Sequence, residues 1–481
     1  MTQSARWIET SEFDLPAVQP SRRLSFLKFL FRYPIFLLVF GPPIFRPLDA
    51  YSGYDTSQAH FDFWSIVQVG WIVSVATWSL LRLAYARSVL IPKQVRSILK
   101  YAFFLGLLFV VSVAYSPGRA VSAELSIVYF LTLSCVVAFI ADVYWDPPNW
   151  MHCLFHLRLI LFVLLGLVLA ALIIEPGLVL FVIPGAGIRL LGGSIAPMSG
   201  VPAPIAIMSA YCFLHSLESR VRSALSFLAG VIGVLVTQAR GVEISLFIVL
   251  AILVIGWGKT SKRAAYILIS AFMVSVLLAG SVVAVIGGDR IWNQFNRNQS
   301  TAEILTASGR TEIWEDLIRY SLAHPQGMGY IAGIRHVHLG QYATNLRAIL
   351  TKSGGTDNSY MEVLADAGWL ALALYLTIMI KTIVLGRRLE RRQALMGTSG
   401  VNTTTRHALQ CAILLLVFCL LEGMEGSDFV IPLRQEFYMQ NVIIAVILGA
   451  STTMLIALRP QPNAIFQVIS PGTLPNPEAH A

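Results

Sequence analysis

Residues 157–174 read LRLILFVLLGLVLAALII, an apolar stretch in which Arg158 is the only charged residue. As a helix, these roughly eighteen residues would be about 27 Å long, which nearly spans the ~30 Å hydrocarbon core of a bilayer. Similar stretches recur along the chain, and we expect about twelve membrane crossings. They are Leu24–Phe45, Phe63–Leu81, Tyr101–Ser116, Leu125–Val143, Leu157–Ile174, Val201–Leu217, Ala224–Thr237, Ile244–Trp257, Ala264–Ile286, Met361–Val384, Leu409–Leu421 and Val442–Leu458. The sequence therefore predicts an all-α polytopic membrane protein.

The composition supports this fold class. Of the 481 residues, 56% are hydrophobic and only 13% are charged, whereas a soluble domain carries about 25% charged residues. The net charge of +9 does not indicate nucleic acid as a partner, because the basic residues cluster in short connections between apolar stretches. All five cysteines lie within or beside apolar stretches without paired spacing, so neither a disulfide framework nor a zinc site is expected.

The basic residues also predict the topology, because cytoplasmic loops are enriched in Lys and Arg. The densest cluster, Arg387, Arg388, Arg391 and Arg392, follows the tenth expected crossing. With this cluster in the cytoplasm, both termini are cytoplasmic and residues 287–360 form a large periplasmic loop containing short helices. We expect about nine crossings in residues 1–286 and about three in 361–458, with a disordered cytoplasmic tail at 459–481. The protein would then be a multi-pass protein of the cell inner membrane.

Arg240 is the clearest candidate for a functional charge, because it lies between two apolar stretches and is expected at the outer face. Charged residues inside or beside hydrocarbon are costly and frequently functional. Glu243 follows three residues later and could be its ion-pair partner. The competing interpretation is an interfacial arginine that extends to lipid headgroups, and Arg240 alone does not separate the two.

Two further arginines are candidates for binding phosphate. Arg310 opens a capped amphipathic helix in the large loop, where its guanidinium and the helix amides could bind phosphate oxygens together. Arg189, in the run Ile188–Gly193, is a third arginine expected on the outer side. Taken singly, each is more simply explained as a solvated surface arginine.

Asp357 and Asn358 stand just before the crossing that begins near Met361. A carboxylate at this position could act as a general base on a hydroxyl group, or Asp357 or Ser359 could cap the helix that follows. His336 and His338 lack an obvious third ligand, so no metal site is expected. Glu422, Glu425 and Asp428 form an acidic patch that could face the arginines or only mark the membrane edge.

The order of five short motifs resembles the O-antigen ligase and polymerase superfamily. The resemblance spans about Arg189 to Leu370. The order of the motifs along the chain is more specific for this superfamily than any single motif. The motifs are Arg189–Gly193 (similar to "R..G"), Gln238–Gly241 (similar to "SRG"), Ser308–Trp314, His324–Tyr330 (a proline–glycine turn) and Asp357–Leu370 (similar to "HNxYL…E.G..GL").

This resemblance implies a metal-independent glycosyltransferase of fold type C that needs no cofactor. Its implied donor is a glycan linked to undecaprenyl pyrophosphate. Arg240 and Arg310 would bind the leaving pyrophosphate with help from Arg189, and Asp357 would be the catalytic base. Asn358, Tyr360 and Glu243 would contribute to substrate binding. The expected partners are the lipid-linked oligosaccharide and membrane lipids, and a chain-length regulator or another polysaccharide-assembly protein is a further candidate.

Asp357 departs from the family pattern, because it occupies the position of the histidine that the family uses as base. An aspartate could take the proton if its surroundings raised its pKa. The departure favours a polymerase over a ligase that moves glycan onto a lipid A core, because polymerase sequences vary more at this position. A transporter of lipid-linked sugars is the alternative from another class, although we find no internal repeat of the kind that transporters often carry.

Overall fold

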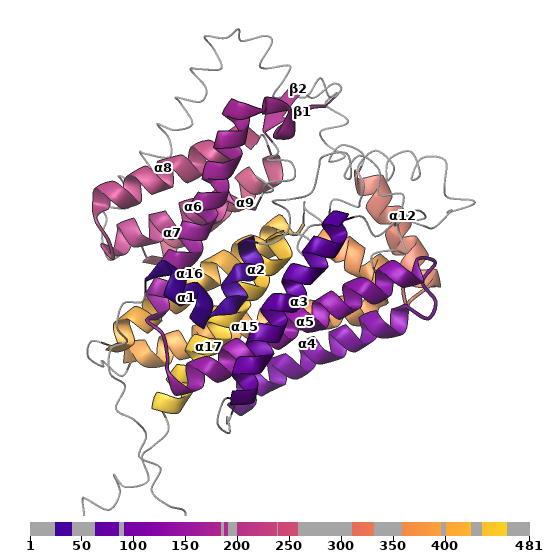
Figure 1. Ribbon diagram of the computed structural model, residues 1–481, viewed down its shortest axis with the longest axis horizontal. Coiled ribbons are helices and arrows are strands. Elements are labelled where there is room, and N and C mark those ends of the chain that lie inside the picture. The colour runs from indigo at the N-terminus through magenta and orange to yellow at the C-terminus, as the bar shows by residue number, and fades with distance from the viewer. Residues whose placement is uncertain are drawn as a thin grey trace, which may run out of the picture.

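The structure is a computed structural model that describes residues 25–40, 63–85, 91–183, 187–190, 200–237, 239–257, 310–330, 358–395, 401–424 and 435–458. Long helices dominate this part of the chain (Figure 1). In chain order the elements are α1 (Phe26–Arg32), η1 (Pro34–Phe36), α2 (Leu37–Phe40), α3 (Phe63–Tyr85), α4 (Lys93–Ser112), α5 (Arg119–Trp145), α6 (Trp150–Ile174), η5 (Pro176–Leu178), β1 (Leu180–Ile183), β2 (Gly187–Leu190), α7 (Pro202–His215), α8 (Arg220–Thr237), α9 (Arg240–Trp257), α12 (Arg310–Ala323), α15 (Ser359–Leu395), α16 (Val401–Glu422) and α17 (Gln435–Ala457).

Eight helices in the described residues are long and apolar enough to cross a membrane, namely α3, α4, α5, α6, α8, α15, α16 and α17. The predicted polytopic all-α fold is therefore confirmed, with the short antiparallel hairpin β1–β2 as an addition that the sequence did not suggest. The expected crossing Val201–Leu217 corresponds to α7, which is only 14 residues long. The expected crossing Ala264–Ile286 lies outside the described residues.

The first expected crossing, Leu24–Phe45, differs from the structure. Residues 26–40 form three short helices instead of one, and the chain turns at Tyr33 and Pro34. Proline lacks a backbone N–H and disfavours helical geometry in the residue before it. Tyr33 has φ −123° and ψ 74°, outside the helical region, and Pro34 starts the next helical turn. The sequence predicted one continuous helix here because the residues on both sides of Tyr33 and Pro34 are mostly apolar, and hydropathy alone does not reveal a turn between them.

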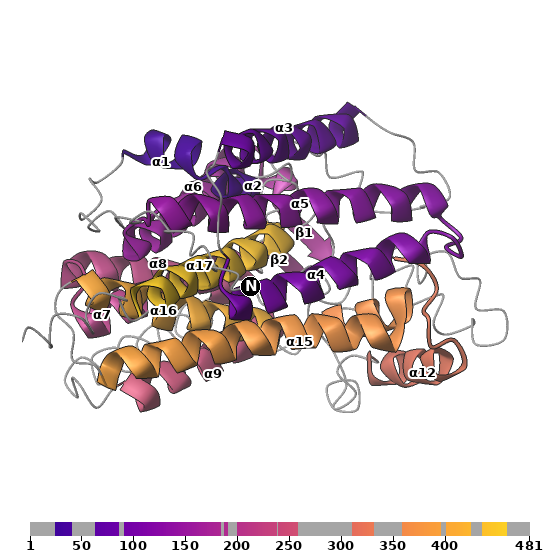
Figure 2. The same ribbon diagram turned by 90° about the horizontal axis from the view of Figure 1, so that it is seen from below.

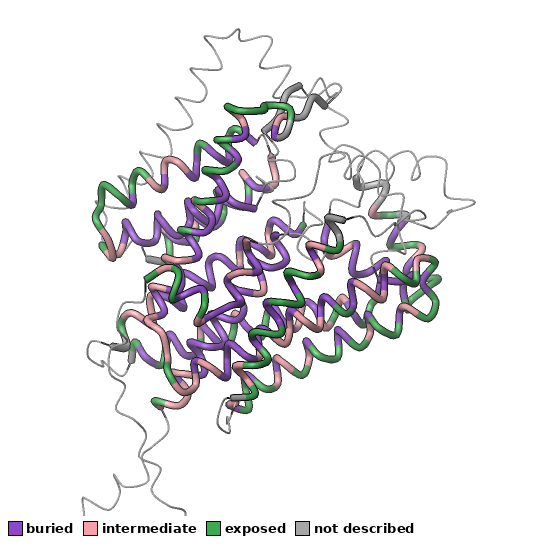
Figure 3. The backbone as a smooth tube through the Cα atoms, in the orientation of Figure 1, coloured by how far each residue is buried: buried purple, intermediate pink, exposed green. Residues whose placement is uncertain are grey.

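The last long helix, α17, lies in the middle of the bundle. Of its apolar stretch 78% is buried, the largest share among the eight candidate spans, and Figure 3 shows it buried along most of its length. It packs against α5, α15 and α16, and Gly449 allows close approach because a Cβ there would lie 2.6 Å from the Trp150 ring. Figure 2 shows both α17 and α4 between α5 and α15, with α4 towards the right of the view.

A buried ion pair joins α6 to the connection between α7 and α8. Arg158, 4% exposed, donates from both guanidinium NH₂ groups to the two carboxylate oxygens of Glu218, each at 2.6 Å. Ser223 donates a further hydrogen bond to Glu218 at 2.9 Å. Burial acts to raise the pKa of Glu218, but the hydrogen bonds and charge of Arg158 outweigh it and hold that pKa below its usual range.

Candidate active site at the start of helix α15

Helix α15 contains a complete break at Gly368, which has φ 83° and ψ 180°. The residues before it, Ser359–Ala367, form a short segment that turns away from the long helix after Trp369 (Figure 2). Only glycine adopts this backbone conformation readily. The expected crossing from Met361 is therefore corrected: its straight part begins at Trp369, and the short segment before it is buried inside the protein.

The proline–glycine turn of residues 324–330 produces this break. Pro325 accepts a hydrogen bond from the Trp369 N–H at 3.2 Å, while the amides of Met328 and Gly329 donate to the carbonyls of Ala365 and Asp366 at 2.9 and 2.8 Å. Gly327 and Gly329, at φ 79° and 118°, let the turn approach so closely. Two motifs about forty residues apart in the sequence thus form one backbone assembly, which we call the 325–369 clip (Pro325–Gly329 with Ala365–Trp369).

Side chains from α4 and α5 anchor the clip to the bundle. The Tyr330 ring stacks on Phe109 with their centroids 3.7 Å apart. Its N–H donates to the Ser112 hydroxyl at 2.9 Å, and its carbonyl accepts from Ser122 at 2.7 Å. Burial, with the nearby charges of Asp366 and Glu362, raises the pKa of Tyr330 well above its ordinary value. The clip is therefore fixed by packing and not only by its own backbone bonds.

Asn358 holds the start of the short segment against the end of α16. Its Oδ1 accepts hydrogen bonds from the amides of Tyr360 and Met361 at 2.9 and 3.0 Å, which is N-cap geometry. Its Nδ2 donates to the Met424 carbonyl at 2.9 Å. The predicted cap residue was Asp357 or Ser359, so this prediction is corrected: the Asn358 side chain does the capping, and Asp357 lies outside the described residues.

Two neighbouring residues complete this contact. The Ser359 N–H donates to the Gly423 carbonyl at 2.8 Å, and the Tyr360 hydroxyl donates to the Leu420 carbonyl. Asn358 and Tyr360, which we had expected to bind substrate, thus both bind carbonyls at the C-terminal end of α16. These bonds fix the chain immediately after Asp357.

Buried carboxyl groups surround this end of the bundle. Glu362, Asp366, Glu422 and Glu436 are each at most 5% exposed. Glu436 faces the start of α7, since a Cβ on Gly200 would lie 2.7 Å from its Cγ. Of these four, only Glu422 was predicted from the sequence as part of an acidic patch. Glu362 and Asp366 lie within the Asp357–Leu370 motif without a role of their own, and Glu436 lies just before the expected crossing Val442–Leu458. Ionisable residues within or beside apolar stretches are a signal that could have identified them.

Arg240 is the first residue of α9, and it is half-buried together with Glu243 on the same turn. The turn before it is ordered by Thr237, whose hydroxyl accepts from the Ala239 N–H at 3.3 Å and donates to the Val234 carbonyl. Helix α9 packs against α16, the helix whose end also holds Asn358. Helix α16 is therefore the common neighbour of the Arg240 helix and of the short segment.

The other predicted site residues are placed only by their backbones. Arg189 lies in β2, where it pairs with Phe181 of β1, and Arg310 is the first residue of α12. The far end of α12 meets the clip, because the Trp369 indole N–H donates to the Ser321 carbonyl at 3.1 Å. The side chains of Arg189 and Arg310, and all of His336, His338, Glu425 and Asp428, lie outside the described residues. No cluster suited to a metal ion occurs among the residues that are described.

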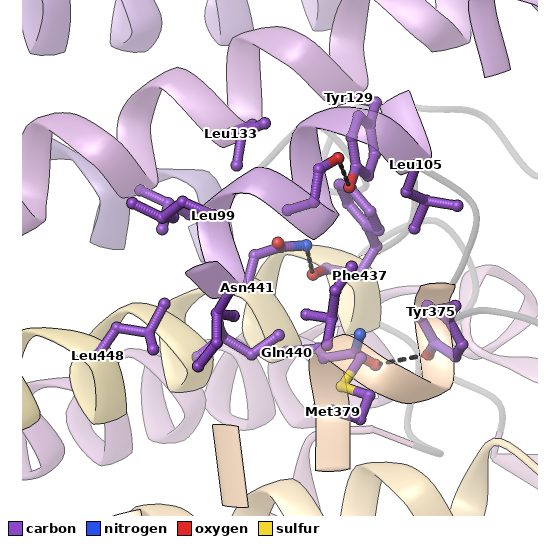
Figure 4. Close-up of a pocket in the computed structure, with 15 residues that line it drawn as sticks. Leu99, Leu105, Tyr129, Leu133, Tyr375, Met379, Phe437, Gln440, Asn441 and Leu448 are labelled. Atoms are coloured by element: carbon purple, nitrogen blue, oxygen red, sulfur yellow. Dashed lines mark hydrogen bonds between the residues drawn. The ribbon is translucent and has the colours of Figure 1, made fainter. Parts of the chain in front are cut away.

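A small cavity of about 40 Å³ lies between α4, α5, α15 and α17, at the level of the membrane-crossing stretches. Figure 4 shows mainly aliphatic and aromatic side chains around it, with a few polar groups from α17 and α15. Tyr375 donates to the Gln440 side-chain oxygen at 3.2 Å, and the Asn441 amide donates to the Phe437 carbonyl at 2.9 Å. The lining therefore suits a small, mostly apolar group, such as a few carbon atoms of a hydrocarbon chain.

Part of the chain is similar to a known protein family. No curated protein matches the chain. The family model described as O-antigen ligase matches residues 225–376. The matched region contains Arg240, the α12 helix that begins at Arg310, the clip and the short segment of α15. The resemblance to the O-antigen ligase and polymerase superfamily is thus confirmed over residues 225–376, which hold four of the five motifs.

Proposed function

We propose that this protein is a polysaccharide polymerase at the outer face of the inner membrane, with both termini in the cytoplasm. It transfers a growing glycan from undecaprenyl pyrophosphate to another lipid-linked repeat unit. The observation that carries the proposal is the 325–369 clip together with the Asn358 cap. They hold the residues beside Asp357 rigidly at the end of a membrane-spanning bundle, where a lipid-linked donor and acceptor can meet.

The proposed reaction needs two contributions from the protein, a base and cations that stabilise the leaving group. Asp357 takes the proton of the acceptor sugar hydroxyl as its oxygen attacks the anomeric carbon of the donor. The bond from that carbon to the pyrophosphate oxygen breaks, and its electron pair leaves with the pyrophosphate. Arg240 and Arg310, assisted by Arg189, stabilise the charge that develops there, as preorganised cations do strongly in a site of low dielectric constant. The step is balanced without a metal ion.

The proposed donor also explains why the protein has an apolar cavity among its membrane-crossing helices. In this proposal part of its polyprenyl chain enters the cavity between α4, α5, α15 and α17 while the pyrophosphate stays at the membrane surface. A hydrocarbon chain in such a cavity gains its binding free energy from buried apolar area.

Transfer of the glycan to a lipid A core is the second candidate, because the matched family is described as O-antigen ligase. The aspartate at position 357 favours the polymerase. Both alternatives use the same donor and leaving group, so they differ only in the acceptor.

The experiment uses the full chain in lipid nanodiscs with a synthetic undecaprenyl-pyrophosphate oligosaccharide. We expect wild type to build a ladder of glycans, also in the presence of EDTA, and Asp357→Ala and Arg310→Ala to lose it. Arg319→Ala is the matched control, because this arginine is exposed on the same helix and, among the described residues, pairs with Glu315 one turn away. A product that forms only when a lipid A-type acceptor is added would show a ligase, and no transfer to either acceptor would refute the enzyme proposal.

A further inference from the structure

Lys381 is a charged residue on the lipid-facing surface of the bundle. It lies within the apolar part of α15, and its side chain is exposed. Its ammonium nitrogen donates a hydrogen bond to the Tyr101 hydroxyl of α4 at 3.1 Å and lies 4.3 Å from the centroid of that ring. In the described part of the chain Lys381 forms no salt bridge with an acidic residue.

The depth of Lys381 can be estimated along the helix. Trp369, 40% exposed at the start of the straight part of α15, is the kind of residue that marks a membrane interface. At 1.5 Å per residue, Lys381 lies about 18 Å beyond it and Arg388 about 28 Å beyond it. A hydrocarbon core of ~30 Å then ends near Arg388, so Lys381 is about 10 Å inside that boundary. A charge at this depth without an anionic partner is costly.

A second basic residue lies between Lys381 and the boundary. Arg388 follows two turns later on the same exposed face of α15. Helices α4 and α15 pack side by side (Figure 2), so Lys381 and Arg388 of α15 and Tyr101 of α4 define one seam. An ammonium group has three donors, and the bond to Tyr101 occupies one of them.

We propose that this seam binds the phosphate headgroup of an anionic phospholipid from the leaflet at the Arg388 end of the bundle. The bilayer thins locally around such a charge, so the lipid phosphate lies below the neighbouring headgroups, where it accepts hydrogen bonds from Lys381 and Tyr101, while Arg388 adds positive charge nearer the membrane surface. Tyr101 holds the ammonium group by its ring and hydroxyl, so that the remaining N–H groups face the lipid. Lysine side chains that only extend to the interface would need neither the tyrosine nor a particular lipid. This binding site is independent of the proposed transferase activity.

The test measures which lipid the purified protein keeps. Wild type is purified in mild detergent with equal amounts of phosphatidylglycerol and phosphatidylcholine of the same acyl chains, and bound lipids are counted by native mass spectrometry. We expect wild type to retain phosphatidylglycerol in preference. Lys381→Met, which keeps the length of the side chain, should lower that preference about fivefold, the factor that corresponds to about 1 kcal/mol per basic residue near a lipid surface.

Two variants separate a specific site from general attraction. Lys28→Met removes an exposed lysine from α1, which lies away from α4 in both views (Figures 1 and 2), and should leave the preference unchanged. Tyr101→Phe keeps the ring but removes the hydroxyl, and should give an intermediate loss. An equal loss in Lys28→Met and Lys381→Met, or no loss in a Lys381→Met protein with a wild-type unfolding temperature, would overturn the proposal.

Discussion

Gly368 lies directly against the carbonyl oxygen of Pro325: a Cβ added to this glycine would come within 2.1 Å of that oxygen. The contact joins a loop turn to the break in α15, and it sets the direction of the short segment that carries Asn358.

The first prediction concerns this contact. Gly368→Ala combines a steric clash with a backbone conformation at φ 83° that alanine rarely adopts. We expect it to destabilise the clip by about 2–4 kcal/mol and to lower the thermal unfolding temperature in detergent. Gly166→Ala on the exposed face of α6 is the control, because nothing lies within 4 Å of its added Cβ. Equal unfolding temperatures for the two variants would contradict the prediction.

The second prediction separates capping from other roles of Asn358. Asn358→Ala removes the acceptor for the Tyr360 and Met361 amides and the donor to Met424. A lost cap costs about 1 kcal/mol, and the misplaced Asp357 should lower transfer further. Asn358→Asp keeps the cap acceptors, so it should recover most of the unfolding temperature. If the Asp variant were no more stable than the Ala variant, capping would not be the stabilising contact.

The third prediction concerns the charge of Arg240. If this residue stabilises the leaving pyrophosphate, Arg240→Ala should lower kcat by about 10²–10³-fold, as loss of one preorganised donor does, while the protein stays folded. Arg222→Ala serves as control, because Arg222 is 74% exposed at the other end of α8. A change in KM alone would assign Arg240 to binding without a contribution to the chemical step.

The fourth prediction is a pH dependence of stability. Because Arg158 holds the pKa of Glu218 below its usual range, the unfolded chain binds a proton here more readily than the folded protein does. The ion pair therefore contributes its full stability above the unfolded pKa of about 4.3, and that contribution is lost as the pH falls through the folded pKa. The unfolding temperature of wild type should fall more steeply between pH 7 and pH 3 than that of Glu218→Gln.

The same pair can be tested by removing its cation. Arg158→Met leaves the Glu218 carboxylate partly buried without its main partner and should cost about 3–5 kcal/mol. The double variant Arg158→Met, Glu218→Gln should recover part of this loss, because no buried charge remains. Additive losses in the double variant would contradict a direct pairing.

The fifth prediction concerns the cavity. Ala102→Trp places a large ring among its lining residues, and it should lower transfer from a full-length undecaprenyl donor more than from a donor with a short prenyl chain. Phe103→Trp, on the exposed face of the same helix, should affect neither. Equal losses with both donors would show that the cavity does not accommodate the chain.

The sequence alone was enough to predict those features that depend only on the residues within one helix. The apolar spans could be predicted because the hydropathy of each span lies in its own residues, and the order of the motifs that contain Pro325 and Gly368 indicated the family, although not that the two motifs are in contact. The sequence could not predict the break in α15, because the conformation of Gly368 depends on a turn about forty residues earlier. It also placed the cap at Asp357 or Ser359, because the choice of Asn358 depends on where the end of α16 lies in space.

The position of α17 has a consequence for how the protein is made. The helix with the largest buried share is the last one that the structure describes, so its neighbours α5, α15 and α16 are synthesised before the helix that fills the space between them. Until α17 is made, the surfaces of α5, α15 and α16 that pack against it are not yet covered by this helix. Biogenesis should accordingly finish late and in one step: chains stopped before Gln435 should insert into the membrane yet be degraded, whereas chains stopped after Leu458 should accumulate.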